Sequence, residues 1–228
     1  MLRALASALA EMTGAKLGYL PEGGNAVGAH LAGVLPHRSA GGQPVSNPGL
    51  NVAEMLAARL KAFVLLGAIE PNSDMASNAI DALKQAECVI ALTPYSTAKD
   101  YAHIILPIGT FAETSGTYVN VEGQWQSVPG AAKPVGESRP GWKVLRVLGN
   151  LLNLTGFDYV SSDQVRDELR AAVGPLVPDN SYHAGGTVSR SGAPELVSDV
   201  PMYAVDGIVR RATALQKTAE ALSFRTSA

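Results

Sequence analysis

The sequence predicts an α/β protein with a doubly wound, mostly parallel sheet, a β-hairpin and a helical C-terminal extension. Three short apolar runs, at 62–66, 88–92 and 102–107, have the non-alternating character of strands in a sheet that is covered on both faces. Helical patterns separate these runs, and a strand–helix–strand order gives parallel pairing through a right-handed crossover. Residues 15–107 are therefore predicted to form an open α/β unit.

Composition narrows the class of protein. The 228 residues suffice for one large domain, or for a domain with an extension, and 46% hydrophobic against 17% charged residues is typical of a folded protein. The net charge of −2 gives no electrostatic case for nucleic acid. The longest apolar runs, 62–69 and 88–94, are far shorter than the roughly 20 residues of a membrane helix, so no direct membrane insertion is expected.

The single cysteine, Cys88, lies in a predicted strand. One cysteine excludes an intrachain disulfide and a four-thiolate iron–sulfur or zinc site. We therefore expect Cys88 to be a small buried hydrophobic residue.

The first part of the chain is predicted from apolar spacing and glycine content. Residues 2–12 have the periodicity of an amphipathic helix, and 15–20 are compatible with a strand. A glycine-rich turn follows, with a short helix from Ala26, and the composition of 38–49 indicates a loop.

The central helices carry start signals. Asn51 and Glu54 have the spacing of a capping box before a helix. The stretch 71–74 supplies turn and start residues for the next helix, whose apolar positions include Ile80 and Leu83.

A hairpin is predicted at 117–128. Alternating residues at 117–121 lead to Glu122-Gly123 as a two-residue turn, and 124–128 returns as the second strand. Gly116 at the entry and Gly123 at the turn are expected to permit the backbone turns.

The C-terminal part is predicted to be mostly helical. Residues 129–141 indicate a linker, and a helix begins near Trp142. Ser161 and Gln164 suggest the cap of another helix, and 174–201 is long and irregular.

A last helix is predicted from Asp206, with one narrow apolar seam and Arg210, Arg211 and Lys217 off it. We expect this seam to pack on its own domain. The seam consists of Ile208, Ala212, Leu215, Ala219 and Leu222.

These elements predict three parts. An α/β domain at 1–128 includes the hairpin at 117–128. A linker with packing helices occupies 129–173, and an irregular loop with the last helix occupies 174–228.

Local motifs give no catalytic, cofactor-binding or metal residue. The stretch 23–28 fits neither a phosphate loop nor a dinucleotide fingerprint, so a plain turn is favoured over a nucleotide contact. Arg210-Arg211 could bind an anion, but a solvated helix face is the more common arrangement. Glu113 and Glu122 would need to lie within about 10 Å to act as a pair, which a hairpin does not guarantee.

The four histidines, His30, His37, His103 and His183, have no partner at metal-ligand spacing. His103 is expected to form a hydrogen bond in or near the core.

The stretch 102–126 resembles a segment of the molybdopterin-dependent oxidoreductase superfamily, in which a strand ending in Leu-Pro precedes Phe-Ala-Glu and a Gly-Thr-x-x-Asn-x-Glu-Gly hairpin. The matching positions are Leu106, Pro107, Phe111, Ala112, Glu113, Gly116, Thr117, Asn120, Glu122, Gly123 and Gln126. Gln124 stands where a basic residue is usual.

Three further stretches, 139–157, 62–74 and 203–219, resemble the family of the large iron–sulfur subunit of bacterial NADH:quinone oxidoreductase, respiratory complex I. The resemblance covers most of the chain and is weakest over 174–200. It implies the C-terminal portion of such a subunit, present as a fragment or as a split subunit.

That resemblance implies a scaffold in the peripheral arm, at the cytoplasmic face of the inner membrane, with other subunits of complex I as partners. Iron–sulfur clusters would lie elsewhere, in the N-terminal part of the subunit or in the complex, and none in this chain. Glu113 and Asn120 are then expected to satisfy backbone groups at the base of the hairpin.

Two alternatives stay open. The chain could belong to a molybdenum or tungsten oxidoreductase such as a formate dehydrogenase, with pterin contacts from loops near 67–74 and 93–99. It could instead be a nucleotide-binding module that uses Gly23, Gly24 and Asn25.

Overall fold

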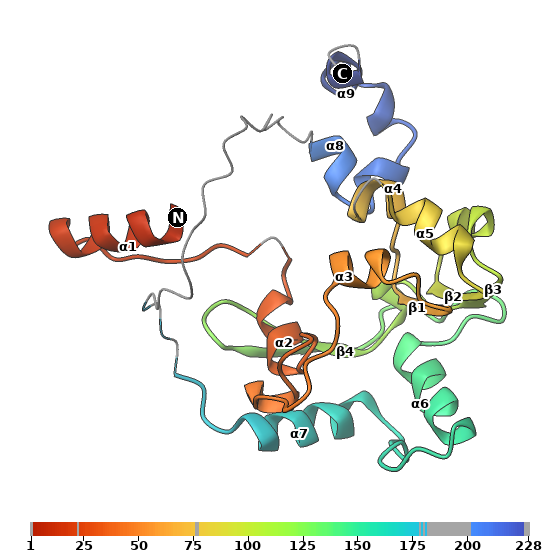
Figure 1. The fold of residues 1–228 in the computed structure, drawn as a ribbon, viewed down its shortest axis with the longest axis horizontal. Coiled ribbons are helices and arrows are strands. Elements are labelled where there is room, and N and C mark those ends of the chain that lie inside the picture. The colour runs from red at the N-terminus through yellow and green to blue at the C-terminus, as the bar shows by residue number, and fades with distance from the viewer. Residues whose placement is uncertain are drawn as a thin grey trace. The chain divides into compact units, whose positions relative to one another are not determined.

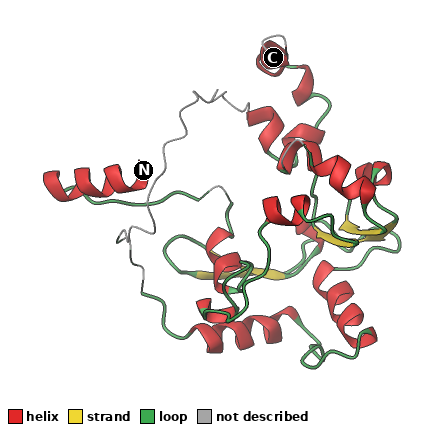
Figure 2. Cartoon of the chain, viewed as in Figure 1, coloured by secondary structure: helices red, strands yellow, loops and turns green. Residues whose placement is uncertain are grey.

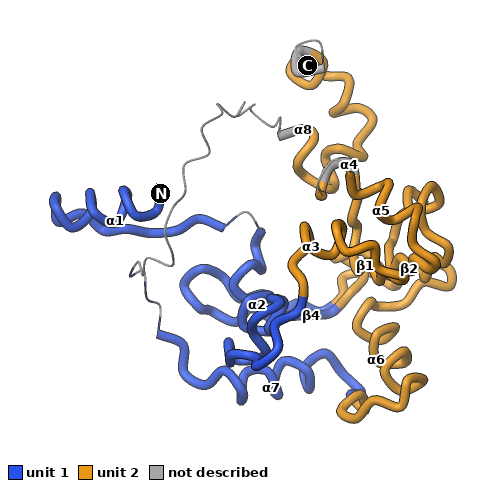
Figure 3. The backbone as a smooth tube through the Cα atoms, in the orientation of Figure 1, with its two compact units in different colours: residues 1–49, 115–129, 159–195 blue, residues 50–114, 130–158, 196–228 orange. Residues whose placement is uncertain are grey.

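A computed structural model describes residues 2–21, 23–75, 78–177, 179, 181 and 202–225. The chain forms two compact units that alternate along the sequence (Figure 3). Unit 1 contains residues 1–49, 115–129 and 159–195, and unit 2 contains 50–114, 130–158 and 196–228. The division into parts at residues 128 and 173 stays a prediction.

Unit 2 holds the parallel sheet and most of the helices (Figures 1 and 2). Its elements, with 3₁₀ helices labelled η, are α3 (Val52–Ala57), β1 (Ala62–Leu66), α4 (Pro71–Asp74), α5 (Ala79–Gln85), β2 (Cys88–Thr93), η2 (Ser96–Asp100), β3 (Ile104–Pro107), η3 (Phe111–Glu113), α6 (Gly141–Leu151), α8 (Met202–Val205), η4 (Val209–Arg211), η5 (Leu215–Lys217) and α9 (Ala219–Arg225).

The sheet has the order β1-β2-β3, and both pairings are parallel. Leu66 pairs with Leu92, and Thr93 pairs with Pro107, so the three strands end at the same edge. The predicted fold class is therefore confirmed: an α/β arrangement with a parallel sheet, a hairpin and C-terminal helices.

One face of the sheet carries the core of unit 2. Leu83 of α5 is completely buried against this face, and burial of such a side chain contributes about 1.5–3 kcal/mol. The core cluster consists of Phe63, Leu65, Leu83, Ala86, Val89, Ala91, Ala98 and Tyr101.

The other face of β1 differs from the prediction of a sheet covered on both sides. Phe63 and Leu65 are buried, whereas Val64 and Leu66 are about half exposed, so β1 alternates like a strand with one covered face. Within unit 2 the start of α6 approaches this second face, since a Cβ on Gly141 would lie 3.8 Å from Leu66. That contact reaches only the end of β1.

Unit 1 contains helices and the hairpin. Its elements are α1 (Leu2–Thr13), α2 (Ala26–Leu31), η1 (Ala40–Gly42), β4 (Gly116–Val119), β5 (Trp125–Val128) and α7 (Ser162–Val173). The helix predicted at 2–12 and the helix from Ala26 are confirmed. The strand predicted at 15–20 is wrong, because this stretch is irregular and largely exposed, and none of the strand pairings among the described residues includes it.

Two predicted helix caps are confirmed. Asn51 N donates to Glu54 Oε2 at 2.8 Å, and Glu54 N donates to Asn51 Oδ1 at 3.0 Å, which completes the capping box of α3. Ser161 Oγ accepts from Gln164 N at 3.3 Å at the start of α7.

The hairpin is present, but its turn is longer than predicted. β4 and β5 pair antiparallel with Val119 opposite Trp125, so the connection runs from Asn120 to Gln124 and is not a two-residue turn. Asn120 Oδ1 accepts from Glu122 N at 3.0 Å and from Gln124 N at 2.9 Å. The asparagine side chain thus organises a wider loop than Glu122-Gly123 alone would form.

The two hairpin glycines have different roles. Gly123 has φ +78°, a conformation that favours glycine, as predicted. Gly116 lies in β4, is not among the positive-φ glycines, and a Cβ there would meet no atom within 4 Å. The prediction that Gly116 is needed for a turn is therefore wrong.

The single helix predicted from Asp206 is also wrong. The chain forms the short helices η4, η5 and α9 instead, and Ala212 and Thr218 between them have extended ψ values of 96° and 157°. Side-chain caps mark two of the helix starts: Asp206 Oδ1 accepts from Ile208 N and Val209 N just before η4, and Thr218 Oγ1 accepts from Ala221 N at 3.3 Å just before α9. Most of the loop predicted at 174–201 lies outside the described residues.

Candidate functional site at the carboxyl edge of the sheet

The loops that follow β1 and β2 leave the sheet at one edge. Leu66 and Leu92 are register partners, and Gly67 N donates to Leu92 O at 2.9 Å. Doubly wound sheets bind their ligands outside the carboxyl ends of such strands. The alternative of a molybdenum or tungsten oxidoreductase places its pterin contacts in these same loops, near 67–74 and 93–99.

The first loop brings two carboxylates together. α4 begins at Pro71, a residue suited to the first turn of a helix, and Glu70 N donates to Asp74 Oδ2 at 2.7 Å. Glu70 and Asp74 are therefore fixed one helical turn apart at the carboxyl edge.

Two arginines from the C-terminal segment bind these carboxylates. Arg210 donates from Nη1 and Nη2 to the two oxygens of Asp74, at 2.8 Å each, in a bidentate pair. Arg210 Nε lies 2.9 Å from Glu70 Oε2, and Arg211 Nη2 donates to Glu70 Oε1. The four side chains form one network that joins α4 to η4; we call it the arginine–carboxylate cluster.

Other groups also hold the arginines. The guanidinium of Arg211 stacks on the ring of Tyr95, 3.8 Å from its centroid, and donates to Gly207 O. Arg210 Nη2 lies 3.4 Å from Ala68 O. Both loops of the carboxyl edge thus contribute to the position of the arginines.

The four side chains of the cluster are partly or largely buried. The arginines are the deeper partners, with exposed side-chain fractions of 9% for Arg210 and 18% for Arg211, against 20% for Glu70 and 33% for Asp74. The hydrogen bonds from Arg210 hold the pKa of Asp74 below its ordinary value, although burial opposes this shift. The same contact raises the pKa of Arg210.

The expectation of a solvated face at Arg210-Arg211 is thus wrong. The prediction that the apolar seam packs on its own domain is not confirmed, because its members Ile208, Leu215 and Leu222 are 55%, 41% and 48% exposed. Within unit 2 it is α8, before the seam, that contacts α4. Local sequence could not reveal the pairing, because more than 130 residues separate Asp74 from Arg210. The available signal was two acids four residues apart and two adjacent arginines.

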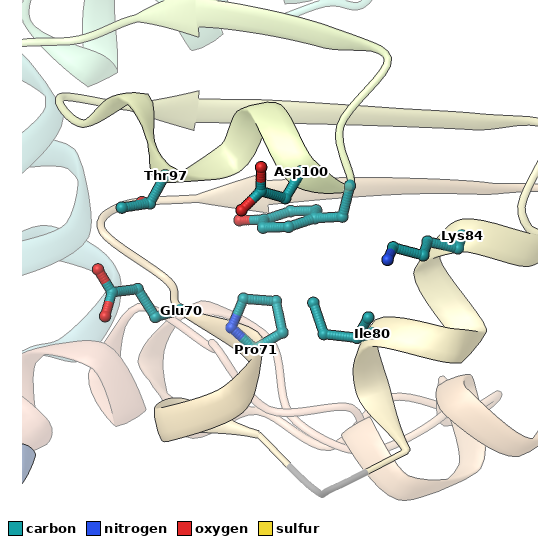
Figure 4. A pocket seen from close by; sticks show the side chains of 7 residues that line it. Glu70, Pro71, Ile80, Lys84, Thr97 and Asp100 are labelled. Atoms are coloured by element: carbon teal, nitrogen blue, oxygen red, sulfur yellow. The ribbon is translucent and has the colours of Figure 1, made fainter.

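A cleft of about 430 Å³ adjoins the cluster (Figure 4). Pro71 and Ile80 form part of its wall, and the side chain of Lys84 extends toward it from α5. The lining residues are Glu70, Pro71, Ile80, Lys84, Thr97, Asp100 and Tyr101. Tyr101 is fixed by its hydroxyl, which donates to Ile69 O at 3.1 Å.

The glycine turn in unit 1 has a structural role. Asn25 Oδ1 accepts from Val119 N at 2.8 Å, which ties the start of α2 to the hairpin. The adjoining hollow of about 180 Å³ is lined by Pro21, Gly23, Gly24, Val27, Val119, Asn120 and Val121. The described residues of this lining carry no charged side chain, which favours the turn over a nucleotide contact.

Two further expectations concern single residues. His103 Nδ1 accepts from Val89 N at 3.0 Å, so the predicted hydrogen bond near the core is confirmed. Cys88 is half-buried rather than fully buried, since it begins β2. His183 lies outside the described residues.

The polar residues of the hairpin region satisfy backbone donors, as predicted. Glu113 Oε2 accepts from Thr110 N at 2.7 Å, and this bond lowers the pKa of Glu113. Asn120 also accepts backbone hydrogen bonds, but within the loop and not at the base of the hairpin. A glutamate held in its charged form as a cap is poorly suited to donate a proton in catalysis.

In the described part of the chain, no three or more of His, Cys, Asp and Glu gather in a way that could hold a metal ion. Nor does any helix among these residues have both the length and the apolar character needed to cross a membrane.

The comparison with protein families identifies the class. Residues 1–151 match the molybdopterin oxidoreductase family, and the chain belongs to this family.

The individual relatives carry the names of several different enzymes. The chain is 34% identical to the mitochondrial NADH-ubiquinone oxidoreductase 78 kDa subunit of Candida albicans, over 52% of this chain and 16% of that protein. It is 37% identical to a predicted formate dehydrogenase of Staphylococcus aureus, over 36% of this chain and 8% of that protein. It is 29% identical to a nitrate reductase of Synechocystis, over 63% of this chain and 24% of that protein. The chain thus spans less than a quarter of the length of each relative.

The family implies a molybdopterin, an anionic group that carries phosphate. The carboxyl edge of the sheet does not fit it, because the two arginines suited to an anion already bind Glu70 and Asp74. The adjoining cleft is lined by two carboxylates, Glu70 and Asp100, against one cation, Lys84, and this balance of charge disfavours a further anion.

Proposed function

We propose that this chain is a scaffold segment in the peripheral arm of an NADH:quinone oxidoreductase of the complex I type. It would support electron transfer from NADH to quinone without holding a redox group itself. The observation that carries this proposal is the arginine–carboxylate cluster. The edge where a doubly wound sheet binds its ligand is occupied by the chain's own Arg210 and Arg211.

The similarity to a protein named as the 78 kDa subunit of NADH-ubiquinone oxidoreductase supports this assignment. The partners would then be the other subunits of respiratory complex I, on the cytoplasmic face of the inner membrane. The iron–sulfur clusters would lie elsewhere in the subunit or the complex, since the only cysteine is Cys88. The chain alone would not be catalytic.

A second candidate is part of a molybdopterin-dependent oxidoreductase such as a formate dehydrogenase. Its support comes from the formate dehydrogenase and nitrate reductase relatives and from the cleft of about 430 Å³ beside the carboxyl edge. In this case the arginine–carboxylate cluster would have to open or shift before the group could bind.

Elemental analysis of the native assembly separates the two candidates. The chain is tagged in its own cell, the assembly is purified, and iron, molybdenum and tungsten are quantified per chain. We expect iron without molybdenum or tungsten. Molybdenum or tungsten near one atom per chain would overturn the scaffold proposal and support the oxidoreductase.

A further inference from the structure

Helix α6 packs on unit 2 with one face and exposes apolar side chains on the other. On the inner face, a Cβ at Gly141 would lie 3.5 Å from Ile108 Cδ1, and Gly149 is buried. On the outer face, Val147 is 50% exposed and Leu151 is 75% exposed. These two residues are one helical turn apart, so their side chains follow one another along the helix surface.

The apolar surface continues at the C-terminal end of α6. Leu152 N donates to Leu148 O and Leu154 N donates to Gly149 O, both at 3.0 Å, so the chain stays wound on the helix end. The side chains of Leu152 and Leu154 are also more than half exposed. A contiguous apolar patch of this kind on a protein surface marks an interaction site. We call Val147, Leu151, Leu152 and Leu154 the apolar stripe of α6.

The same helix carries positive charge that has no counter-ion among the described residues. Lys143 is exposed one turn before Val147, and Arg146 is half-buried. Neither side chain forms an ion pair with a described residue, and Arg146 Nε is buried without a hydrogen-bond partner. The sequence of α6 contains no acidic residue. A guanidinium that loses water without gaining a counter-ion costs free energy, so this face favours a partner that supplies carboxylates.

We propose that the outer face of α6 is a docking surface for an acidic amphipathic segment of a different polypeptide. The apolar side chains of that segment lie on the apolar stripe, and its Asp or Glu residues lie beside Lys143 and Arg146. A second copy of α6 is a poor occupant, because it would bring two more cations and no carboxylate to the same surface. The inference goes beyond the proposed function and holds for a scaffold or an enzyme.

The test is carbodiimide cross-linking of the native assembly that contains the tagged full chain. This reagent joins a lysine amine to a carboxylate in contact with it, and mass spectrometry identifies the two joined residues. We expect Lys143 to be joined to an aspartate or glutamate of a different polypeptide. The internal positive control is the exposed ion pair of Lys61 and Glu87, whose Nζ and Oε1 atoms are 3.4 Å apart.

Two variants connect the cross-link to the apolar stripe. Leu151→Asp places a charge in the apolar contact and should lower the yield of the Lys143 link about tenfold or more. Val135→Asp changes another exposed apolar residue of unit 2, outside α6, and should keep the wild-type yield. The link between Lys61 and Glu87 should persist in both variants and reports that unit 2 is folded.

Three results would overturn the proposal. The first is an unlinked Lys143 in a wild-type sample in which Lys61 and Glu87 are linked. The second is a Lys143 link only within this chain or to another copy of it, and the third is an equal yield in wild type and Leu151→Asp. If Leu151→Asp also loses the link between Lys61 and Glu87, Leu154→Asp is measured in its place with the same outcomes. Metal content is a separate measurement, so failure of this proposal and failure of the proposed function are distinguishable.

Discussion

Arg210 and Asp74 form a bidentate pair, with Nη1 and Nη2 each 2.8 Å from one carboxylate oxygen, across 136 residues of sequence. The pair closes the edge of the parallel sheet where the strands of unit 2 end. This pair is one of several contacts, with those of Glu70, Arg211 and Tyr95, that join the loops of the carboxyl edge to the C-terminal segment.

Replacement of Asp74 by Asn should destabilise unit 2. The change removes a charge-assisted bidentate contact with Arg210, whose side chain is only 9% exposed. A hydrogen bond to a charged group contributes about 1.5–3 kcal/mol, so we expect a loss in this range in the free energy of unfolding. Urea unfolding followed by tryptophan fluorescence measures it, with Trp125 replaced by Phe in both proteins so that only Trp142 of unit 2 reports.

The matched control is Asp81→Asn, which neutralises an exposed acid on α5. It should change the free energy of unfolding by no more than about 0.5 kcal/mol. A loss of equal size in both variants would show that overall charge, and not the contact with Arg210, determines the stability.

The same pair predicts a dependence of stability on pH. Hydrogen bonds from Arg210 lower the pKa of Asp74, so the folded state binds its proton less readily than the unfolded state does. The contribution of Asp74 is therefore fully present above its unfolded pKa of about 3.9, and it is lost as the pH falls through the lower, folded pKa.

The measurement compares urea midpoints of wild type and Asp74→Asn as a function of pH. The difference should be constant between about pH 5 and 7 and should shrink below about pH 4. A difference that shrinks already near neutral pH would contradict the assignment to this carboxylate.

The parts of the fold that local sequence determines were predicted well. The strands at 62–66 and 88–92 follow from apolar runs, and the capping box of Asn51 and Glu54 follows from a spacing of three residues. The stretch 15–20 has strand-like composition too, but it takes part in no strand pairing among the described residues. Pairing is a tertiary property, so composition alone could not exclude this strand.

Sequence patterns indicated loops that one alternative would use for a ligand, but they did not indicate which side chains meet there. Parallel topology places the loops after β1 and β2 at one edge, and the alternative of a molybdenum or tungsten oxidoreductase put its pterin contacts there. The occupation of that edge by Arg210 and Arg211 was missed. The seam from Ile208 to Leu222 has helical spacing, but the backbone is extended at Ala212 and Thr218, so the segment divides into η4, η5 and α9.

The hairpin glycines offer a paired test. Gly123 has φ +78°, so Gly123→Ala should lower the free energy of unfolding by about 1–2 kcal/mol. Gly116→Ala should be neutral or stabilising by up to about 1 kcal/mol, because its φ is ordinary and its surroundings are open. Amide exchange of the hairpin compares the two variants. Equal losses would mean that both glycines are needed for the turn.

Gly149 of α6 is predicted to be required by packing and not by backbone conformation. It is buried, and a Cβ at this position would lie 2.3 Å from Cδ1 of Phe157. Overpacking of this kind costs about 1–3 kcal/mol, which exceeds the gain of about 1 kcal/mol that alanine brings to a helix. Gly149→Ala should therefore lower the free energy of unfolding, as measured by urea denaturation.

The neighbouring Asn150 is exposed, and Asn150→Ala should instead raise the free energy of unfolding by about 0.5 kcal/mol, because only the helix propensity changes. A stabilised Gly149→Ala variant would show that Phe157 moves aside at little cost.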